Sequence, residues 1–432
     1  MSDIIIYGRG KTGQSLYKML QKLGKQSVFY DDEHGFDGNI KFCRDSLVIL
    51  SPGISPYADG VLTAKKSGAR VIGELEFCLP YIKGQTVSVT GTNGKTTTCE
   101  MINHILQAQG ESVYLLGNGG VPLSAKVLDV SCDDIIVLES SSFQLAECNN
   151  FSPYISVCTS FACDHLNYHG SMNAYRQAKI NNFAHQNKSG YAIFNADDKA
   201  VVEMSKECAC NKLFYSMTNG QSDCYCDGSN LFINTDGSIR KTAIPGLATL
   251  ARHNLSNALA AILTCKLLGV SEEFSVRALQ NYRILPHRLQ IVDTLCGVTF
   301  VDDSKATNVH ATVSALNNFD TNTALILGGS DKGEPFDQIF ENIKDNVKLI
   351  VAVGETARAI ADCGRDHNIE VVILGDIKQA TVYCYGKLKD LGGGTVLMSN
   401  ACASFDKFKG YAERGDYFQR VVRELHSDEE KN

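Results

Sequence analysis

The stretch Gly91-Thr92-Asn93-Gly94-Lys95-Thr96-Thr97-Thr98 decides the fold of this 432-residue chain. It stands between an apolar, β-branched run at 86–90, which predicts a strand, and a helical pattern that begins at Cys99. Glycines in such a loop let backbone N–H groups turn toward an anion, the helix adds its dipole, and Lys95 adds a positive charge. The Thr96 hydroxyl is suited to bind Mg²⁺. Since Val89 stands where the full phosphate-loop pattern has glycine, the stretch predicts an abbreviated nucleotide-binding loop; the alternative is a structural turn.

Short apolar runs alternate with helical patterns on both sides of this loop, which is typical of parallel sheets with crossover helices. Breaks near residues 84 and 285 predict three α/β units, 1–84, 85–284 and 285–432. Turn residues among alternating side chains at 223–244 predict a small antiparallel sheet in the second unit. The predicted strands are 4–7, 28–30, 47–50 and 70–72 in the first unit, 86–90, 135–138, 154–159, 191–195 and 212–215 in the second, and 298–301, 324–327, 349–353, 371–374 and 395–398 in the third.

Charge and hydropathy narrow the class of protein. Forty-one basic and 48 acidic residues give a net charge of −7, which argues against a general nucleic-acid binder because phosphate neutralisation needs a basic face. No apolar run approaches the ~18 residues of a membrane span. The first residues lack the basic segment of a signal peptide. We therefore expect a cytoplasmic protein with no membrane insertion and no nucleic-acid partner.

The 16 cysteines do not predict a disulfide framework, because several stand inside apolar helical or strand patterns as small buried thiols do. Two close pairs invite a zinc interpretation, Cys208-Ala209-Cys210 and Cys224-Tyr225-Cys226. Their one-residue gaps depart from the usual spacing, and no histidine lies between them. We expect free thiols.

A second glycine turn, Gly8-Arg9-Gly10-Lys11-Thr12-Gly13, follows the first predicted strand, and Asp31 and Asp32 end the next strand. This is the dinucleotide-binding fingerprint: a helix N-terminus for a pyrophosphate and an acid near a ribose or base. Alone it suggests an NAD-dependent dehydrogenase. An oxidoreductase, however, has no use for the Gly-Lys-Thr loop that the chain also carries.

Further polar residues follow predicted strands. Glu139 ends a buried strand where a second Mg²⁺ ligand belongs, and His165 is a candidate metal ligand; the alternatives are a surface acid and an ordinary loop histidine. Two polar stretches follow strands of the third unit: Asp302-Asp303-Ser304-Lys305-Ala306-Thr307-Asn308 and Gly328-Gly329-Ser330-Asp331-Lys332-Gly333. They predict a cationic rim that could bind a small dicarboxylate or a terminal phosphate. The alternative is a pair of solvated loops.

Together these residues resemble the Mur ligase family, ATP-dependent amide-forming enzymes of peptidoglycan synthesis. The loop 91–96 carries the resemblance with Glu139, His165 and Lys179. The strings His287-Arg288-Leu289, Asp303-Ser304-Lys305-Ala306-Thr307-Asn308 and Ala401-Cys402-Ala403-Ser404-Phe405-Asp406 are similar to the D-glutamate-adding branch of the family. The motifs lie in all three units. The resemblance implies a Rossmann-like N-terminal domain, a central P-loop-type ATP-binding domain and a Rossmann-like C-terminal domain.

The resemblance also implies the reaction. The L-alanyl carboxylate of UDP-N-acetylmuramoyl-L-alanine takes the γ-phosphate of ATP, and the amine of D-glutamate attacks the acyl phosphate, with two Mg²⁺ ions as cofactors. We expect a monomer, and a hinge near Pro286. Three alternatives stay open: a nicotinamide oxidoreductase, a phosphate-loop switch protein, and another amide ligase such as a sister cell-wall ligase or folylpolyglutamate synthetase.

Roles for individual residues follow from the resemblance. The implied catalytic residues are Lys95, His165, Lys179, Arg288 and Lys305. The implied ATP contacts are Gly91, Thr92, Asn93, Gly94, Lys95, Thr96, Thr97, Asn254, Asn257, Arg288, Asp303 and Lys305. UDP-sugar contacts are implied for Gly10, Lys11, Thr12, Asp31, Asp32, Ser51, Asn118 and His165, and D-glutamate contacts for Thr307, Lys332, Ser404 and Tyr411. The implied metal ligands are Thr96, Glu139, His165 and Lys179, the lysine as a carbamate. Tyr411, Asn400 and Ser330 depart from the family pattern around the glutamate pocket.

Overall fold

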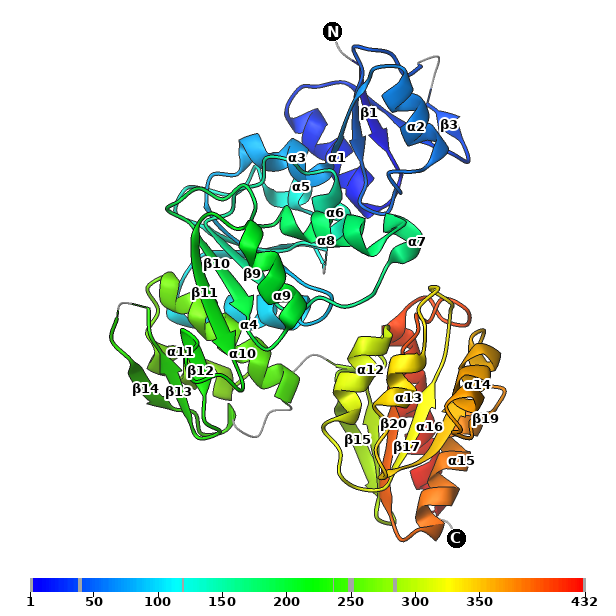
Figure 1. Ribbon diagram of the computed structural model, residues 1–432. Helices are drawn as coiled ribbons and strands as arrows, with labels where there is room; N and C mark the ends of the chain where they lie inside the picture. Colours follow the sequence, from blue (N-terminus) through cyan, green and yellow to red (C-terminus); the bar gives the residue numbers. More distant parts are fainter. Residues whose placement is uncertain are drawn as a thin grey trace. The chain divides into compact units, whose positions relative to one another are not determined.

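Three separate sheets, each covered by helices, organise the protein (Figure 1). The computed structural model describes residues 3–37, 41–118, 120–235, 237–247, 252–282 and 286–429. Contacts group the chain into two compact units, Met1–Ala162 with Tyr168–Tyr282, and Cys163–Asn167 with Arg283–Asn432. The first unit contains two sheets and the second contains one. The expected boundary near 285 lies outside the described residues.

The N-terminal sheet has five strands: β1 (Ile4–Tyr7), β2 (Ser27–Asp31), β3 (Gly35–Phe36), β4 (Leu47–Leu50) and β5 (Arg70–Gly73). Its helices are α1 (Lys11–Lys22), α2 (Asp59–Lys66), α3 (Glu74–Cys78) and the 3-10 turn η1 (Leu79–Tyr81). The strand order is β3-β2-β1-β4-β5, parallel except for β3. The first strands are added on one side of β1, and the chain then returns to add β4 and β5 on the other side. Open α/β sheets bind ligands at the point where the strand order reverses in this way, here between β1 and β4. The four predicted strands are confirmed, and β3 was not predicted.

The central sheet has nine strands: β6 (Gln85–Thr90), β7 (Val113–Gly117), β8 (Ile135–Glu139), β9 (Ile155–Cys158), β10 (Tyr191–Asn195), β11 (Asn211–Ser216), β12 (Cys224–Cys226), β13 (Asn230–Ile233) and β14 (Arg240–Ala243). Its helices are α4 (Lys95–Gln109), α5 (Leu123–Lys126), α6 (Ser142–Ala146), α7 (Leu166–His169), α8 (Met172–Ile180), α9 (Lys199–Met204), η2 (Ser205–Glu207), α10 (Arg252–Leu267) and α11 (Glu272–Gln280). The order is β14-β13-β12-β11-β10-β9-β6-β8-β7. The loops that follow β6, β8 and β9 therefore meet at one edge.

The antiparallel strands expected at 223–244 are present, but they do not form a sheet of their own. β12 pairs parallel with β11, so β12, β13 and β14 extend the central sheet. The separate small sheet is corrected to an antiparallel edge of one mixed sheet. Pairing with β11 satisfies backbone groups of β12 that a free three-stranded sheet would leave exposed.

The C-terminal sheet has six strands: β15 (Gln290–Leu295), β16 (Val298–Asp302), β17 (Thr323–Leu327), β18 (Val347–Ala352), β19 (Val372–Ile373) and β20 (Gly394–Met398). Its helices are α12 (Val309–Leu316), α13 (Asp337–Glu341), α14 (Ala357–Asp366), α15 (Ile377–Asp390) and α16 (Tyr411–Glu429). The order is β15-β16-β20-β17-β18-β19, and only the edge strand β15 is antiparallel. α12, α13 and α14 pack on one face and α15 and α16 on the other (Figure 1).

A buried seam joins the N-terminal and central sheets within the first unit. One apolar cluster contains side chains of both, including Leu16 and Ile49 from the first and Ile136 and Leu145 from the second. Such shared burial holds the two sheets together, since it removes apolar surface of both from water. Within the described ranges, no helix has the length and apolar content needed to cross a membrane.

Two glycines in helices of the C-terminal unit allow the packing of those helices to be tested. A Cβ on Gly364 of α14 would meet Val371 Cγ2 at 2.6 Å and Ile369 O at 2.9 Å, whereas a Cβ on Gly386 of α15 would meet nothing within 4 Å. We expect Gly364→Ala to lower the free energy of unfolding by ~1–3 kcal/mol through overpacking. Gly386→Ala should raise it by ~0.5–1 kcal/mol through helix propensity. Urea unfolding of the full chain measures both, and equal effects would contradict the packing described.

Candidate active site

The glycine loop after β6 is braced by the loop after β9. The backbone N–H groups of Thr92 and Asn93 donate to Ser160 O and Ser160 Oγ at 2.9 and 2.8 Å, and Thr159 Oγ1 donates to Asn93 O at 2.5 Å. A Cβ on Gly91 would meet Thr159 Oγ1 at 2.0 Å. Gly94 begins α4 with a φ of 86°, which favours glycine. The loop is thus a preformed cradle at a helix N-terminus, the geometry that binds phosphate.

Two lysines converge on one carbonyl oxygen of this loop. Lys95 Nζ donates to Gly91 O and Thr92 O, both at 2.8 Å, and Lys179 Nζ donates to Gly91 O, also at 2.8 Å. Lys179 comes from α8, is 1% exposed, and lies 4.7 Å from the ring centroid of Tyr175, one helical turn earlier. Two lysine side chains held this close concentrate positive charge where β6 ends. The pair therefore favours an anionic ligand.

A buried carboxylate lies beside the loop. Glu139 ends β8, pairs in register with Val89 of β6, and is 4% exposed. Asn118, after β7, donates its side-chain Nδ2 to Glu139 Oε1 at 2.9 Å. Thr96 is half-buried, whereas Thr97 is fully buried and its Oγ1 has no hydrogen-bond partner among the described residues. Carboxylate and hydroxyl oxygens are the donors that Mg²⁺ prefers, so Glu139 and Thr96 fit such an ion.

α10 brings two asparagines to the same place. Asn257 Oδ1 accepts a hydrogen bond from Thr98 Oγ1 at 3.4 Å and would lie 2.5 Å from a Cβ on Gly94. Asn254 is 1% exposed, and within the described part of the chain neither its Nδ2 nor its Oδ1 has a partner. A buried amide without partners is costly, and a bound polar ligand would satisfy it. Both residues fit the nucleotide contacts expected of them.

A cleft of about 770 Å³ lies at the reversal point of the N-terminal sheet. It contains the glycine turn with Gly10, Lys11 and Thr12, the acids Asp31 and Asp32, and Ser51, and across the seam it reaches Asn118 and Gln144. The exposed Lys11 Nζ donates to Gly120 O, which bridges the two sheets at the rim. The structure thus brings together every residue expected to bind the UDP-sugar except His165, which belongs to the other unit.

The two acids of this cleft already have partners. Asp31 accepts from Arg9 Nε and from the backbone N–H of His34, the latter at 2.7 Å. Burial opposes ionisation of Asp31, but these hydrogen bonds outweigh it and lower its pKa to about 2. Asp32 accepts from Tyr7 Oη at 2.6 Å and Tyr30 Oη at 3.2 Å. Both carboxylates are therefore held in fixed orientations toward the cleft.

In the second unit, a buried arginine fixes the loops after β16 and β20. Arg414, 1% exposed, donates to Ser304 Oγ at 2.9 Å, Ser304 O at 2.8 Å and Cys402 O at 3.0 Å. Burial lowers the pKa of Arg414 to about 10, so it stays charged at neutral pH. Lys305 Nζ lies 3.9 Å from the ring centroid of Tyr411. No sequence motif marks Arg414, because it stands in an ordinary amphipathic helix.

The residue before Ser304, Asp303, is a buried acid with a raised pKa. Asp303 is 7% exposed and accepts from Ser399 Oγ at 2.8 Å and from Leu289 N at 3.2 Å. Burial raises its pKa to about 7, although these hydrogen bonds and the charge of Arg288 oppose the rise. His287 Nδ1 lies 2.6 Å from Asp302 Oδ2. The segment with Arg288 is thereby anchored to the end of β16.

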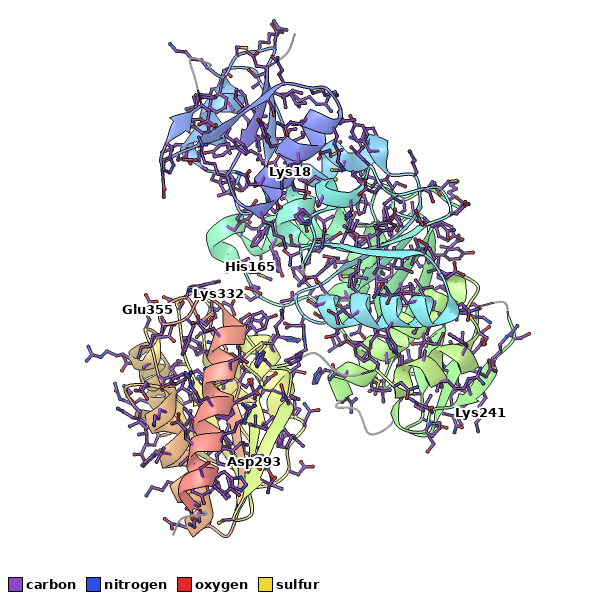
Figure 2. All side chains as sticks on the ribbon, turned by 180° about the vertical axis from the view of Figure 1, so that it is seen from behind. Lys18, His165, Lys241, Asp293, Lys332 and Glu355 are labelled. Carbon is purple, nitrogen blue, oxygen red and sulfur yellow. The ribbon has the colours of Figure 1, made fainter. Side chains whose placement is uncertain are left out.

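The segment 163–167 belongs to the unit that contains Lys332; Figure 2 labels His165 and Lys332. Lys332 Nζ is 3.4 Å from Asp164 Oδ1, and Asn308 Nδ2 donates to Asp164 Oδ2 at 3.2 Å. His165, with a φ of 54°, lies next to this contact. Glu334 is 8% exposed, and its burial and the charge of Asp164 raise its pKa. Ser404 is buried and Thr307 half-buried on adjoining loops. Asp164 and Glu334 were missed because no motif marks a contact between distant loops.

The departures from the family pattern have local roles. Asn400 accepts from Gly328 N through its backbone oxygen at 2.8 Å and donates Nδ2 to Gly328 O at 3.2 Å. Ser330 pairs with Ala403 across the same gap, and its Oγ accepts from Asp406 N at 2.7 Å. Both residues tie the loop after β17 to the loop after β20, so the two loops are held together.

Gly94 provides a direct test of the cradle. We expect Gly94→Ala to weaken binding of a fluorescent ATP analogue at least tenfold, because the new Cβ would press on Asn257 Oδ1 and strain the start of α4. Gly110 ends the same helix with a φ of 96° but has nothing within 4 Å of its Cβ position, so Gly110→Ala is the matched control. Equal affinities of the two variants for the ATP analogue would contradict a role of this loop in nucleotide binding.

Comparisons with known proteins agree with this geometry. Residues 89–265 match the family described as Mur ligase middle domain, and residues 287–402 match the Mur ligase, glutamate ligase domain. A UDP-N-acetylmuramoylalanine--D-glutamate ligase of Thermoanaerobacter sp. (strain X514) is 32% identical over 447 residues, covering 98% of each chain. The protein of the same name from Alkaliphilus metalliredigens (strain QYMF) is 35% identical with the same coverage.

Solved structures share the fold. MurF ligase from Thermotoga maritima, in complex with ADP, superposes with a TM-score of 0.62 at 18% identity, over 98% of this chain and 96% of that chain. A pseudomurein peptide ligase type C from Methanothermus fervidus gives 0.62 at 16% identity, over 98% and 100%. The resemblance inferred from sequence is confirmed: with relatives above 30% identity along nearly its whole length, the chain belongs to the Mur ligase family.

Proposed function

We propose that the chain joins D-glutamate to UDP-N-acetylmuramoyl-L-alanine at the expense of ATP, through an acyl phosphate, in peptidoglycan precursor synthesis. The observation that carries the chemistry is the convergence of Lys95 and Lys179 on Gly91 O beside the buried Glu139. The identity of the amino acid is supported by the relatives named D-glutamate ligases and by the string 303–308.

In the first step, the alanyl carboxylate attacks the γ-phosphorus of ATP and ADP leaves. Both reactants are anions, so the barrier falls only if fixed positive charge surrounds the transferring group. Lys95 and the N–H groups at the start of α4 would supply that charge on the central sheet. Asn254 and Asn257 would bind the nucleoside, and Arg288, Asp303 and Lys305 are the proposed contacts from the other unit.

Mg²⁺ would add further neutralisation of the phosphoryl oxygens. Glu139 and Thr96 fit one ion by their oxygen donors. For a second ion we propose His165 and Lys179. An ammonium cannot bind a cation, but addition of CO₂ to the Lys179 amine, with loss of one proton, gives a carbamate with two anionic-oxygen donors. The carbamate would also replace the repulsion between Lys95 and Lys179 by attraction.

In the second step, the amine of D-glutamate attacks the acyl carbonyl, and phosphate leaves. Lys332, Thr307 and Ser404 are proposed to bind the carboxylates of D-glutamate, and Tyr411 to line the pocket. The buried Arg414 supports them by holding Ser304, Cys402 and Ala403 in place. A preorganised pocket of this kind matters because an acyl phosphate hydrolyses unless the amine is already positioned.

We further propose domains 1–84, 85–284 and 285–432 for the UDP-sugar, ATP and amino acid. ATP and nucleotide-linked sugars are substrates of the cytoplasm, so we place the enzyme there, and we propose a monomer because each site is assigned residues of one chain.

Phosphate release from ATP tests the function. With UDP-N-acetylmuramoyl-L-alanine and Mg²⁺ present, D-glutamate should stimulate release strongly, whereas L-glutamate, L-alanine and diaminopimelate should not. Mass spectrometry should find the product heavier by one glutamyl residue. Stimulation by a different amino acid would indicate a sister ligase, and phosphate release that no amino acid changes would indicate a phosphate-loop switch protein.

Lys179→Ala tests the carbamate. We expect loss of ligation by a factor of at least 10², on the scale of a preorganised charge at a reacting centre. Acetate or formate should restore part of the activity, because a small carboxylate would take the place of the carbamate. Lys188→Ala, which removes an exposed lysine of the same unit, is the control and should keep its activity. A nearly fully active Lys179→Ala enzyme would contradict the proposal.

A further inference from the structure

A cysteine, a histidine and an aspartate converge on helices of the C-terminal unit, on residues that the active site does not use. Asp337 begins α13, Cys363 lies in α14, and His367 follows the end of α14. Each offers one ligand atom, and the three atoms all lie within 4.8 Å of one another. Among the residues that the structure describes, this is the only such group of three.

Local structure explains the convergence. The four-residue spacing of Cys363 and His367 places both side chains on one face of the chain as it leaves α14. α13 packs against α14, and His367 Nε2 lies 3.2 Å from Asp337 Oδ1. The ring of Phe340 stacks on the imidazole, with centroids 5.8 Å apart and planes at 17°, which fixes the ring's orientation. The cluster is therefore built from α13 and the C-terminal end of α14, and the Phe340 ring packs against its histidine.

We propose that Asp337, Cys363 and His367 form a zinc site, with water as the fourth ligand. Thiolate, imidazole and carboxylate together are the donors that Zn²⁺ prefers, whereas Mg²⁺ and Ca²⁺ require oxygen donors. A tetrahedral zinc with bonds of about 2.0–2.3 Å separates its ligand atoms by roughly 3.3–3.7 Å. The histidine–aspartate pair, at 3.2 Å, is close to this spacing. The other pairs of ligand atoms, which lie within 4.8 Å of each other, need to approach by at most about 1 Å.

The charges around the site favour a cation. Besides Asp337, the carboxylates of Asp366 and Glu341 face the Cys363 thiol, and the C-terminal end of α14 adds its partial negative charge. Burial and these acids raise the pKa of Cys363, so the thiol is protonated without metal. Binding of Zn²⁺ forms the Zn–S bond and breaks the S–H bond, and the proton passes to water.

A metal here would link α13 to α14 on one face of the sheet. Without metal, the same residues form only a histidine–aspartate hydrogen bond beside a thiol. The two states differ in one property that can be observed directly, a bond between the metal and the sulfur of Cys363.

Cobalt substitution tests the proposal on the full chain, after chelation and in excess Mg²⁺ to saturate oxygen sites. Added Co²⁺ should give an intense near-ultraviolet thiolate charge-transfer band that saturates at one equivalent and disappears on adding Zn²⁺. Cys363→Ser should abolish the band, and His367→Gln should weaken Zn²⁺ binding at least tenfold in calorimetry. Cys296→Ser, which removes an exposed cysteine of the same unit, is the control and should keep both signals.

The expected result includes a higher melting temperature of the wild type with Zn²⁺ and no such rise in Cys363→Ser. Because Cys363 and His367 are only half-buried, both variants should melt near the wild type in chelator. No band in the wild type, or a band that survives in Cys363→Ser, would overturn the site.

Discussion

The carbonyl oxygen of Gly91 accepts hydrogen bonds from two lysine ammonium groups, and the rest of the active site depends on that contact. Lys95 reaches it from the helix that follows the loop, and Lys179 reaches it from a helix more than 80 residues later. The contact concentrates positive charge where β6 ends. The reaction proposed brings negative charge to this place, as the phosphates of ATP and a carbamate on Lys179.

Close packing around a glycine shapes the ligand-binding edge of all three sheets. In each, a parallel strand ends in a turn whose glycines allow backbone and side chains to approach closely: Gly13 against Gly8 O, Gly91 against Thr159, and Gly328 against Val353 O. A side chain at any of these positions would collide with its neighbour. Parallel strands bring such turns to one edge, so each sheet presents a ligand-binding edge of its own. Three edges suit a reaction with three substrates.

Sequence predicted the buried parallel strands well, but it missed the parallel edge strand β7, other edge strands and the long-range contacts. β8 and β17 are buried along their whole length, so their apolar runs stand out, whereas β15 is an edge strand with a bulge and alternating polar residues. The glycine loop and Glu139 were found because local motifs define them. Thr159, Arg414 and the Asp164–Lys332 contact were not, because they follow from tertiary packing. The role of Lys179 came from family resemblance; its spacing from Gly91 carries no local signal.

The central claim is that a carboxylate is activated by phosphoryl transfer at the Gly91 loop. Oxygen-18 in the alanyl carboxylate of UDP-N-acetylmuramoyl-L-alanine tests it most directly. After complete turnover with ATP, Mg²⁺ and D-glutamate, the account predicts that each phosphate released carries one labelled oxygen and that the other label remains in the new amide. Label in AMP, or phosphate free of label, would contradict it.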